Sequence, residues 1–201
     1  AAESGCLKLD GGAATASAYL YGASLSDVKF DNFNGNGLEC VNNVFESSLV
    51  NVQARAIGTN TTGYCLFFQN GALGSVLSSI DLYGCITSGG LKGVYVKSPT
   101  ADIRIHGGTY ILAQEEGIRL ENDAGSSIIN PHVENNYQGA VDLASGGAGI
   151  YCANRSTIMG AYGTTNSKQK YVVRLYVGAG QVSQIIGGNP GGSTVSYAYL
   201  D

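Results

Sequence analysis

The side chains best suited to chemistry are carboxylates that gather in the middle of the chain. They are Glu115, Glu116, Glu121, Asp123, Glu134 and Asp142. Glycoside hydrolysis uses two carboxyl groups about 5–10 Å apart, one protonated and one ionised. Glu115 or Glu116 together with Glu134 is the pair predicted for that work. His132, two residues before Glu134, is a candidate general base. The alternative is a solvated turn whose carboxylates and histidine make only local hydrogen bonds.

Aromatic and charged side chains near these carboxylates are candidates for binding a substrate. The chain has 13 tyrosines and no tryptophan, and tyrosine combines a flat apolar ring with a polar tip that suits sugar surfaces. We predict that Tyr110, Tyr137, Arg119 and Asp142 contact a substrate. The alternative is that the tyrosine rings pack in the core or in a subunit interface.

A short repeated motif of alternating apolar and polar residues, here called the phrase, predicts the strands that would hold these side chains. Its clearest form is Gly117-Ile118-Arg119-Leu120-Glu121, and similar phrases recur roughly every 27 residues. Their first apolar residues are Leu7, Leu38, Leu66, Val94, Ile118, Val141, Val173 and Val195. Alternation with a period of two indicates a strand with one buried face. Recurrence at this spacing indicates a solenoid.

Other short apolar segments, several followed by glycine-rich bends, lie between the copies of the phrase, and no stretch is typical of a long helix. The sequence therefore predicts an all-β parallel solenoid of about seven to eight rungs. One inward column should contain Leu9, Cys40, Phe68, Val96, Leu120, Leu143, Leu175 and Tyr197. Another should contain Ile105, Ile129, Met159 and Ile186. On the outside, Arg119 should lie beside Asp142, Lys97 beside Glu121, and Asp81 beside Arg104.

Composition narrows the possible functions. The formal net charge is −4 and the 11 Lys and Arg residues are scattered, whereas nucleic-acid and anionic-membrane surfaces need a concentrated basic patch. No apolar run reaches the roughly 20 residues of a membrane helix. The five cysteines include no CxxC pair, which favours small buried apolar residues with free thiols. Neither a cofactor nor a metal site is predicted.

The Ile-x-Gly-Gly turns, and the phrase Asn130-Pro131-His132-Val133-Glu134 followed by Gly139-Ala140-Val141-Asp142-Leu143, resemble the right-handed parallel β-helix of pectate-lyase-like proteins. Within that group the resemblance is greatest to the β-helical shafts of bacteriophage tailspikes. It implies a homotrimer in a virion that binds bacterial surface polysaccharide and contacts other tail proteins. We expect residues 1–201 to be a single β-helix domain from a longer chain.

Three functions fit this reading, because one fold supports many activities. The first is a tailspike or tail-fibre module that recognises polysaccharide without cleaving it. The second is a polysaccharide depolymerase, either a hydrolase or a lyase, that uses carboxylates on one face. The third is a non-catalytic structural or decoration protein of a virion.

Overall fold

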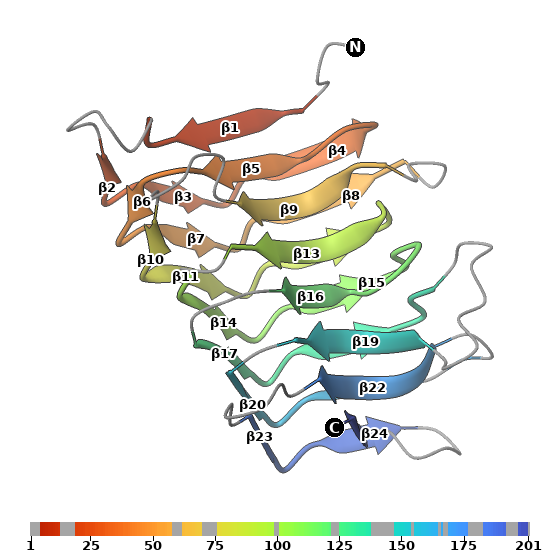
Figure 1. Cartoon of the computed structure of the whole chain (residues 1–201). Coiled ribbons are helices and arrows are strands. Elements are labelled where there is room, and N and C mark those ends of the chain that lie inside the picture. Colours follow the sequence, from red (N-terminus) through yellow and green to blue (C-terminus); the bar gives the residue numbers. More distant parts are fainter. Residues whose placement is uncertain are drawn as a thin grey trace.

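The computed structural model shows a parallel β-solenoid whose coils stack from the N-terminus to the C-terminus (Figure 1). It describes residues 5–12, 19–57, 62–69, 76–98, 101–121, 125–137, 147–153, 155–164, 166, 169–176, 183–191 and 197–200. Within these ranges every regular element is a β-strand. None of their segments is a helix that is long and apolar enough to span a membrane.

The strands form four parallel sheets, here called A to D. Sheet A contains β1 (Leu7–Asp10), β5 (Leu38–Val41), β9 (Tyr64–Gln69), β13 (Lys92–Lys97), β16 (Ile118–Glu121), β19 (Gly147–Cys152), β22 (Gln169–Tyr176) and β25 (Tyr197–Leu200). The short sheet B contains β2 (Leu20–Tyr21), β6 (Val44–Phe45) and β10 (Leu77–Ser78).

Sheets C and D form the other two sides. Sheet C contains β3 (Ser24–Ser26), β7 (Ser48–Val50), β11 (Ile80–Tyr83), β14 (Ile103–His106), β17 (Ser126–Ile129), β20 (Ser156–Met159) and β23 (Gln184–Ile186). Sheet D contains β4 (Lys29–Phe33), β8 (Gln53–Ala56), β12 (Ile86–Ser88), β15 (Thr109–Ile111), β18 (His132–Glu134), β21 (Tyr162–Thr164) and β24 (Asn189–Gly191).

The core lies inside the coils, where like residues stack in columns. The predicted column from Leu9 through Cys40, Phe68 and Val96 to Leu120 is confirmed by the strand register. A second column of sheet A is fully buried and contains Leu38, Leu66, Val94, Ile118, Ile150 and Val173. Burying one such aliphatic side chain contributes about 1.5–3 kcal/mol, so these columns supply much of the stability.

The coil that follows β16 differs from the prediction. The phrase at 139–143, with Asp142 and Leu143, lies outside the described residues, and the strand that pairs with β16 is β19. Its register places Leu120 beside Cys152 and Arg119 beside Tyr151, so the predicted Leu120–Leu143 and Arg119–Asp142 neighbours are wrong. Further along, Leu175 pairs with Tyr199 and not with Tyr197.

The predicted inward column of sheet C is wrong by one residue. Ile105 pairs with Ile128, which continues to Ile158 and Ile185. Ile129 instead pairs with His106 and Met159 on the outer face. Met159 is accordingly 39% exposed, and Ile186, next in that outer column, is 49% exposed. A shift of one residue moves a strand's side chains to the opposite face.

The corner between sheets C and D repeats one backbone conformation along the solenoid. Each coil has a residue with positive φ there, and these residues are Asp27, Asn51, Gly84, Gly107, Asn130, Gly160 and Gly187. Glycine adopts this conformation without steric cost, and Asn and Asp tolerate it better than other residues. At the first coils, the Asn51 side-chain amide also donates to Asp27 Oδ1 at 2.7 Å.

The predicted free thiols are confirmed, but the predicted burial is wrong for Cys6. Cys40, Cys65, Cys85 and Cys152 are buried and Cys6 is exposed, all without disulfides. Burial raises the pKa of Cys40 and Cys65 to about 12 and that of Cys85 to about 11. These three thiols therefore stay protonated at neutral pH and behave as small apolar residues.

Candidate functional site

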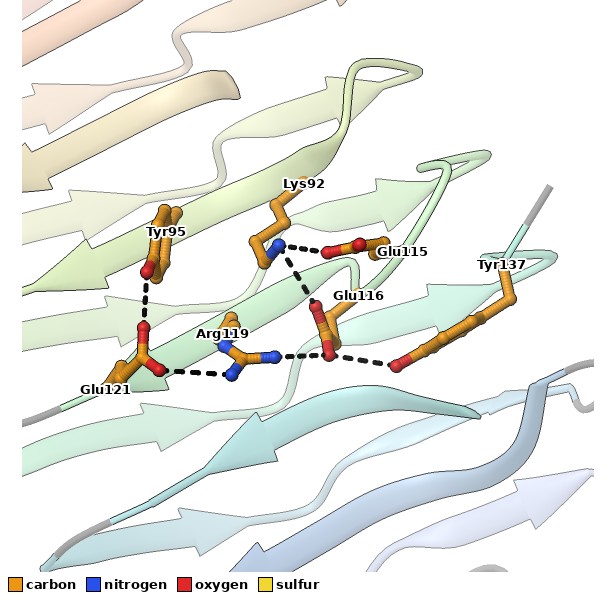
Figure 2. Close-up of polar contacts among 7 residues, drawn as sticks. All are labelled: Lys92, Tyr95, Glu115, Glu116, Arg119, Glu121 and Tyr137. Carbon is orange, nitrogen blue, oxygen red and sulfur yellow. Dashed lines mark hydrogen bonds and ion pairs between the residues drawn. The ribbon is translucent and has the colours of Figure 1, made fainter. Parts of the chain in front are cut away.

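A network of seven charged and aromatic residues lies on the outer face of sheet A and the segment that leads into it. Its members, drawn in Figure 2, are Lys92, Tyr95, Glu115, Glu116, Arg119, Glu121 and Tyr137. Strand alternation positions Tyr95 and Arg119 outward, because their neighbours Val94, Val96, Ile118 and Leu120 belong to the core. The register then places Tyr95 directly beside Arg119 and Lys97 beside Glu121.

Arg119 is the centre of this network. Its Nη1 donates to Glu116 Oε1 at 2.9 Å and its Nη2 donates to Glu121 Oε1 at 3.1 Å. Its guanidinium also lies 4.6 Å from the ring centroid of Tyr151 on β19, within the range of a cation–π contact. Figure 2 shows the guanidinium between the two carboxylates. Arg119 therefore links β16 to the segment before it and to β19.

Lys92 brings a second positive charge from the preceding coil. Its ammonium donates to Glu115 and lies 3.8 Å from Glu116 Oε2. The Lys92 side chain is only 8% exposed, and its ammonium lies 5.2 Å from the ring centroid of Tyr95 and 5.8 Å from that of Tyr64. Two cations are thus shared by three carboxylates, which leaves the network one negative charge in excess.

Tyr137 closes the network at the other end. Its hydroxyl donates to Glu116 Oε1 at 2.9 Å, and the residue is 4% exposed. Its backbone has a φ of +62°, an uncommon conformation for a bulky residue. The ring lies against the backbone of Gly147, where a Cβ atom would come within 2.3 Å of it. The start of β19 must therefore be glycine to accept this ring.

Burial and charge shift the pKa values of several of these groups. Burial, reinforced by the negative charge of Glu116, raises the pKa of Tyr137 far above its ordinary value. For Glu121, burial alone would raise the pKa, but the hydrogen bonds from Tyr95 and Arg119 outweigh it and lower the net value. A general acid needs a carboxyl that keeps its proton near neutral pH, and Glu121 is shifted in the opposite direction.

Aromatic rings extend the network along the outer face of sheet A. Phe67 stacks on Tyr95 with centroids 5.4 Å apart, and Tyr64 contacts both rings at 4.6 and 4.9 Å. Phe67 and Tyr95 are each 7% exposed, while Tyr64 and Tyr151 are partly exposed. The result is an aromatic row whose partly exposed members flank the charged residues.

A second, smaller cluster lies on the outer face of sheet D. His132 Nε2 is 3.2 Å from Glu134 Oε2, and the Thr164 hydroxyl is 3.4 Å from the same oxygen. The His132 ring stacks on Tyr162 with centroids 4.8 Å apart. Glu134 therefore has its own set of partners, which is separate from the ion pairs of Glu115 and Glu116.

The structure thus divides the candidate residues into groups. Glu115, Glu116, Arg119 and Tyr137 share the sheet A network, whereas His132 and Glu134 lie on sheet D. Tyr110 lies in the core with no exposed surface, and its hydroxyl donates to Gly107 O at 3.1 Å. It therefore has no surface to offer a ligand. Asp142 lies outside the described residues.

Sequence reasoning missed Lys92 and did not join Tyr95 to the carboxylates. Both come from the coil before Glu115 and Glu116. The signal that finds them is the register, because Val94 pairs with Ile118 and so brings Lys92, two residues earlier, next to Glu116 in space. Among the residues described, no group of three or more His, Cys, Asp or Glu side chains could hold a metal ion.

Comparisons with models of protein families, with curated protein sequences and with solved structures found no match to this chain. The functional interpretation therefore rests on the parallel β-solenoid and on the chemistry of its surface side chains.

Proposed function

We propose that this β-solenoid recognises bacterial surface polysaccharide and binds it without cleaving it. The observation that carries the proposal is the sheet A network, in which carboxylates, cations and partly exposed aromatic rings lie together on one outer face. Carboxylates accept hydrogen bonds from sugar hydroxyls, Arg and Lys donate to sugar oxygens, and tyrosine rings cover the apolar faces of sugars.

The contacts within the network favour binding over catalysis. Glu115, Glu116 and Glu121 are each ion paired to Lys92 or Arg119. A hydrolase needs one of its two carboxyls to be a proton donor, whereas the hydrogen bonds of Glu121 lower its pKa. Fixed ion pairs hold donors and acceptors in place before a ligand arrives, which lowers the entropic cost of binding.

We further propose that the chain forms part of a phage tailspike or tail fibre, as a right-handed β-helix of seven to eight coils that assembles as a homotrimer with other virion tail proteins. The C-terminal part of the outer column of sheet C, at β17, β20 and β23, supports self-association, because Ile129, Met159 and Ile186 follow one another there and the last two are exposed. Sedimentation of the purified chain tests this part, and a monomer at all concentrations would contradict it.

The binding proposal is tested with purified capsular polysaccharides and lipopolysaccharides, by measuring retention of the protein and release of oligosaccharides. We expect binding without release. Glu121→Gln removes one carboxylate of the network and should weaken binding, whereas Asp31→Asn removes a carboxylate that is ion paired to Lys29 on sheet D and should not. Equal binding by both variants would show that the network is not the site.

A second candidate function is depolymerisation. It is favoured by the 3.2 Å contact between His132 Nε2 and Glu134 Oε2, which places a possible general base beside a carboxylate. If oligosaccharides are released, Glu134→Gln should abolish the release. Cleavage that survives this substitution would remove Glu134 as a catalytic residue.

A further inference from the structure

A polar groove lies on the outer surface of sheet C and of the segments that lead into it from sheet B, away from the network on sheet A. Its volume is about 390 Å³, within the range of about 300–1,000 Å³ typical of small-ligand sites. The residues that line it come from three neighbouring coils and are Glu46, Ser47, Ser48, Ser79, Asp81 and Arg104.

Two of the charged side chains that line this groove, Asp81 and Arg104, pair with each other. Arg104 Nη2 donates to Asp81 Oδ2 at 2.9 Å, and His106 Nε2 lies 3.5 Å from Asp81 Oδ1. The Arg104 side chain remains 40% exposed and that of Asp81 20% exposed. The pair is therefore held in position while both groups keep surface for a ligand. The strand register fixes it, because Asp81 of β11 stands directly beside Arg104 of β14.

An exposed aromatic ring stands next to the groove. Tyr83 is 43% exposed and stacks on His106, with ring centroids 4.7 Å apart and planes 14° apart. Tyr83 is two residues after Asp81 on the same strand, so both side chains point outward about 6.6 Å apart along it. That separation suits a sugar ring whose apolar face lies on Tyr83 while its hydroxyls reach the groove.

The charges of the groove indicate which sugars it takes. Glu46 and Asp81 outnumber Arg104, so the lining carries one net negative charge and disfavours an anionic sugar. Carboxylate oxygens accept hydrogen bonds from adjacent hydroxyls, and the serine hydroxyls both donate and accept. We infer that this groove binds a neutral saccharide unit, with Asp81 and Arg104 holding its hydroxyls and Tyr83 stacking on its ring.

This inference rests on the proposed function in that the saccharide would belong to the same polysaccharide, but it concerns a second face of the solenoid. The test titrates methyl glucoside, methyl galactoside and methyl mannoside into the labelled chain and follows the backbone amide resonances of Ser48, Ser79 and Asp81. We expect these amides to shift with at least one glycoside. Glucuronate should bind several-fold more weakly because its carboxylate meets a negative groove.

Two tyrosines offer a matched pair of variants. Tyr83 and Tyr162 are exposed to the same degree, and each stacks on a histidine at almost the same distance. Tyr83→Ala should weaken glycoside binding about tenfold, which corresponds to about 1.4 kcal/mol. Tyr162→Ala, on sheet D, should leave it unchanged. Asp81→Asn should also weaken binding, and the wild-type amide spectrum outside sheet C reports whether each variant remains folded.

The outcomes separate this inference from the proposed function. If no glycoside shifts the groove amides, or if Tyr83→Ala and Tyr162→Ala lose the same affinity, the groove is not a saccharide site, even if polysaccharide binds through sheet A. If polysaccharide fails to bind while the methyl glycosides still shift the groove amides, the proposed function is wrong and the groove assignment stands.

Discussion

Glu116 should be the charged residue on which the sheet A network depends most. Its side chain is 4% exposed and meets Arg119 at 2.9 Å, and it also accepts the hydrogen bond of Tyr137. Breaking a buried ion pair by removing one partner costs about 3–5 kcal/mol. Arg119 is 25% exposed and keeps Glu121 as a partner. We therefore expect Glu116→Gln to lower the free energy of unfolding by a smaller amount, about 2–3 kcal/mol.

The contribution of Tyr137 can be separated by a double-mutant cycle. Tyr137→Phe keeps the ring and removes only the hydroxyl, whose hydrogen bond to a charged acceptor is worth about 1.5–3 kcal/mol. Glu116 Oε1 keeps Arg119 as a donor, so we expect a loss near the lower end of that range. Because Glu116 and Tyr137 touch, the double variant should lose less than the sum, with a coupling of about 1 kcal/mol.

Urea denaturation at neutral pH measures these changes, with Asp31→Asn as the control. Asp31 pairs with Lys29 on an exposed surface, and such pairs contribute about 0–1 kcal/mol. If Glu116→Gln costs no more than Asp31→Asn, the network does not stabilise the fold. If the double variant equals the sum of the single losses, Glu116 and Tyr137 do not interact as described.

Three further predictions concern the same fold. Gly147→Ala should destabilise the chain by about 1–3 kcal/mol, because the added Cβ would meet the Tyr137 ring at 2.3 Å. Urea denaturation measures this loss, which should be absent when the same substitution is made in a Tyr137→Ala background. Glu121 has a folded pKa below its ordinary value of 4.5, so its contribution to stability is present above that pH and is lost as the pH falls through the folded pKa. The difference in stability between the wild type and Glu121→Gln should therefore shrink in acid, and a constant difference would contradict this. A thiol reagent should modify Cys6 quickly and the four buried thiols only after unfolding, so fast reaction of a second thiol in the native protein would refute the burial assigned here.

The alternation of apolar and polar residues was enough to predict a parallel solenoid and much of its register. Leu9, Cys40, Phe68, Val96 and Leu120 stack as expected, and Lys97 and Asp81 have the outer neighbours predicted for them. The reason is that a buried face repeated in every coil leaves a period-two pattern, and a slip of one residue would turn every side chain of a strand to the opposite face.

That pattern failed where both faces of a strand are apolar. Ile128-Ile129, Ile158-Met159 and Ile185-Ile186 offer two consecutive apolar residues, so the sequence does not say which one points inward. The coil after β16 presents a similar difficulty, because 139–143, outside the described residues, and 149–152, in β19, carry nearly the same phrase. Packing against Ile105 and Leu120 selected Ile128 and Cys152.

The site could be recognised only from the tertiary structure, because its members come from different coils. Composition and local spacing pointed to Glu115, Glu116, Arg119 and Tyr137, but gave no reason to join them to Lys92. That residue is 23 positions from Glu115 in the chain. Only the stacking of one coil on the next turns that separation in sequence into an ion pair, since parallel strands bring residues a full coil apart to about 4.8 Å.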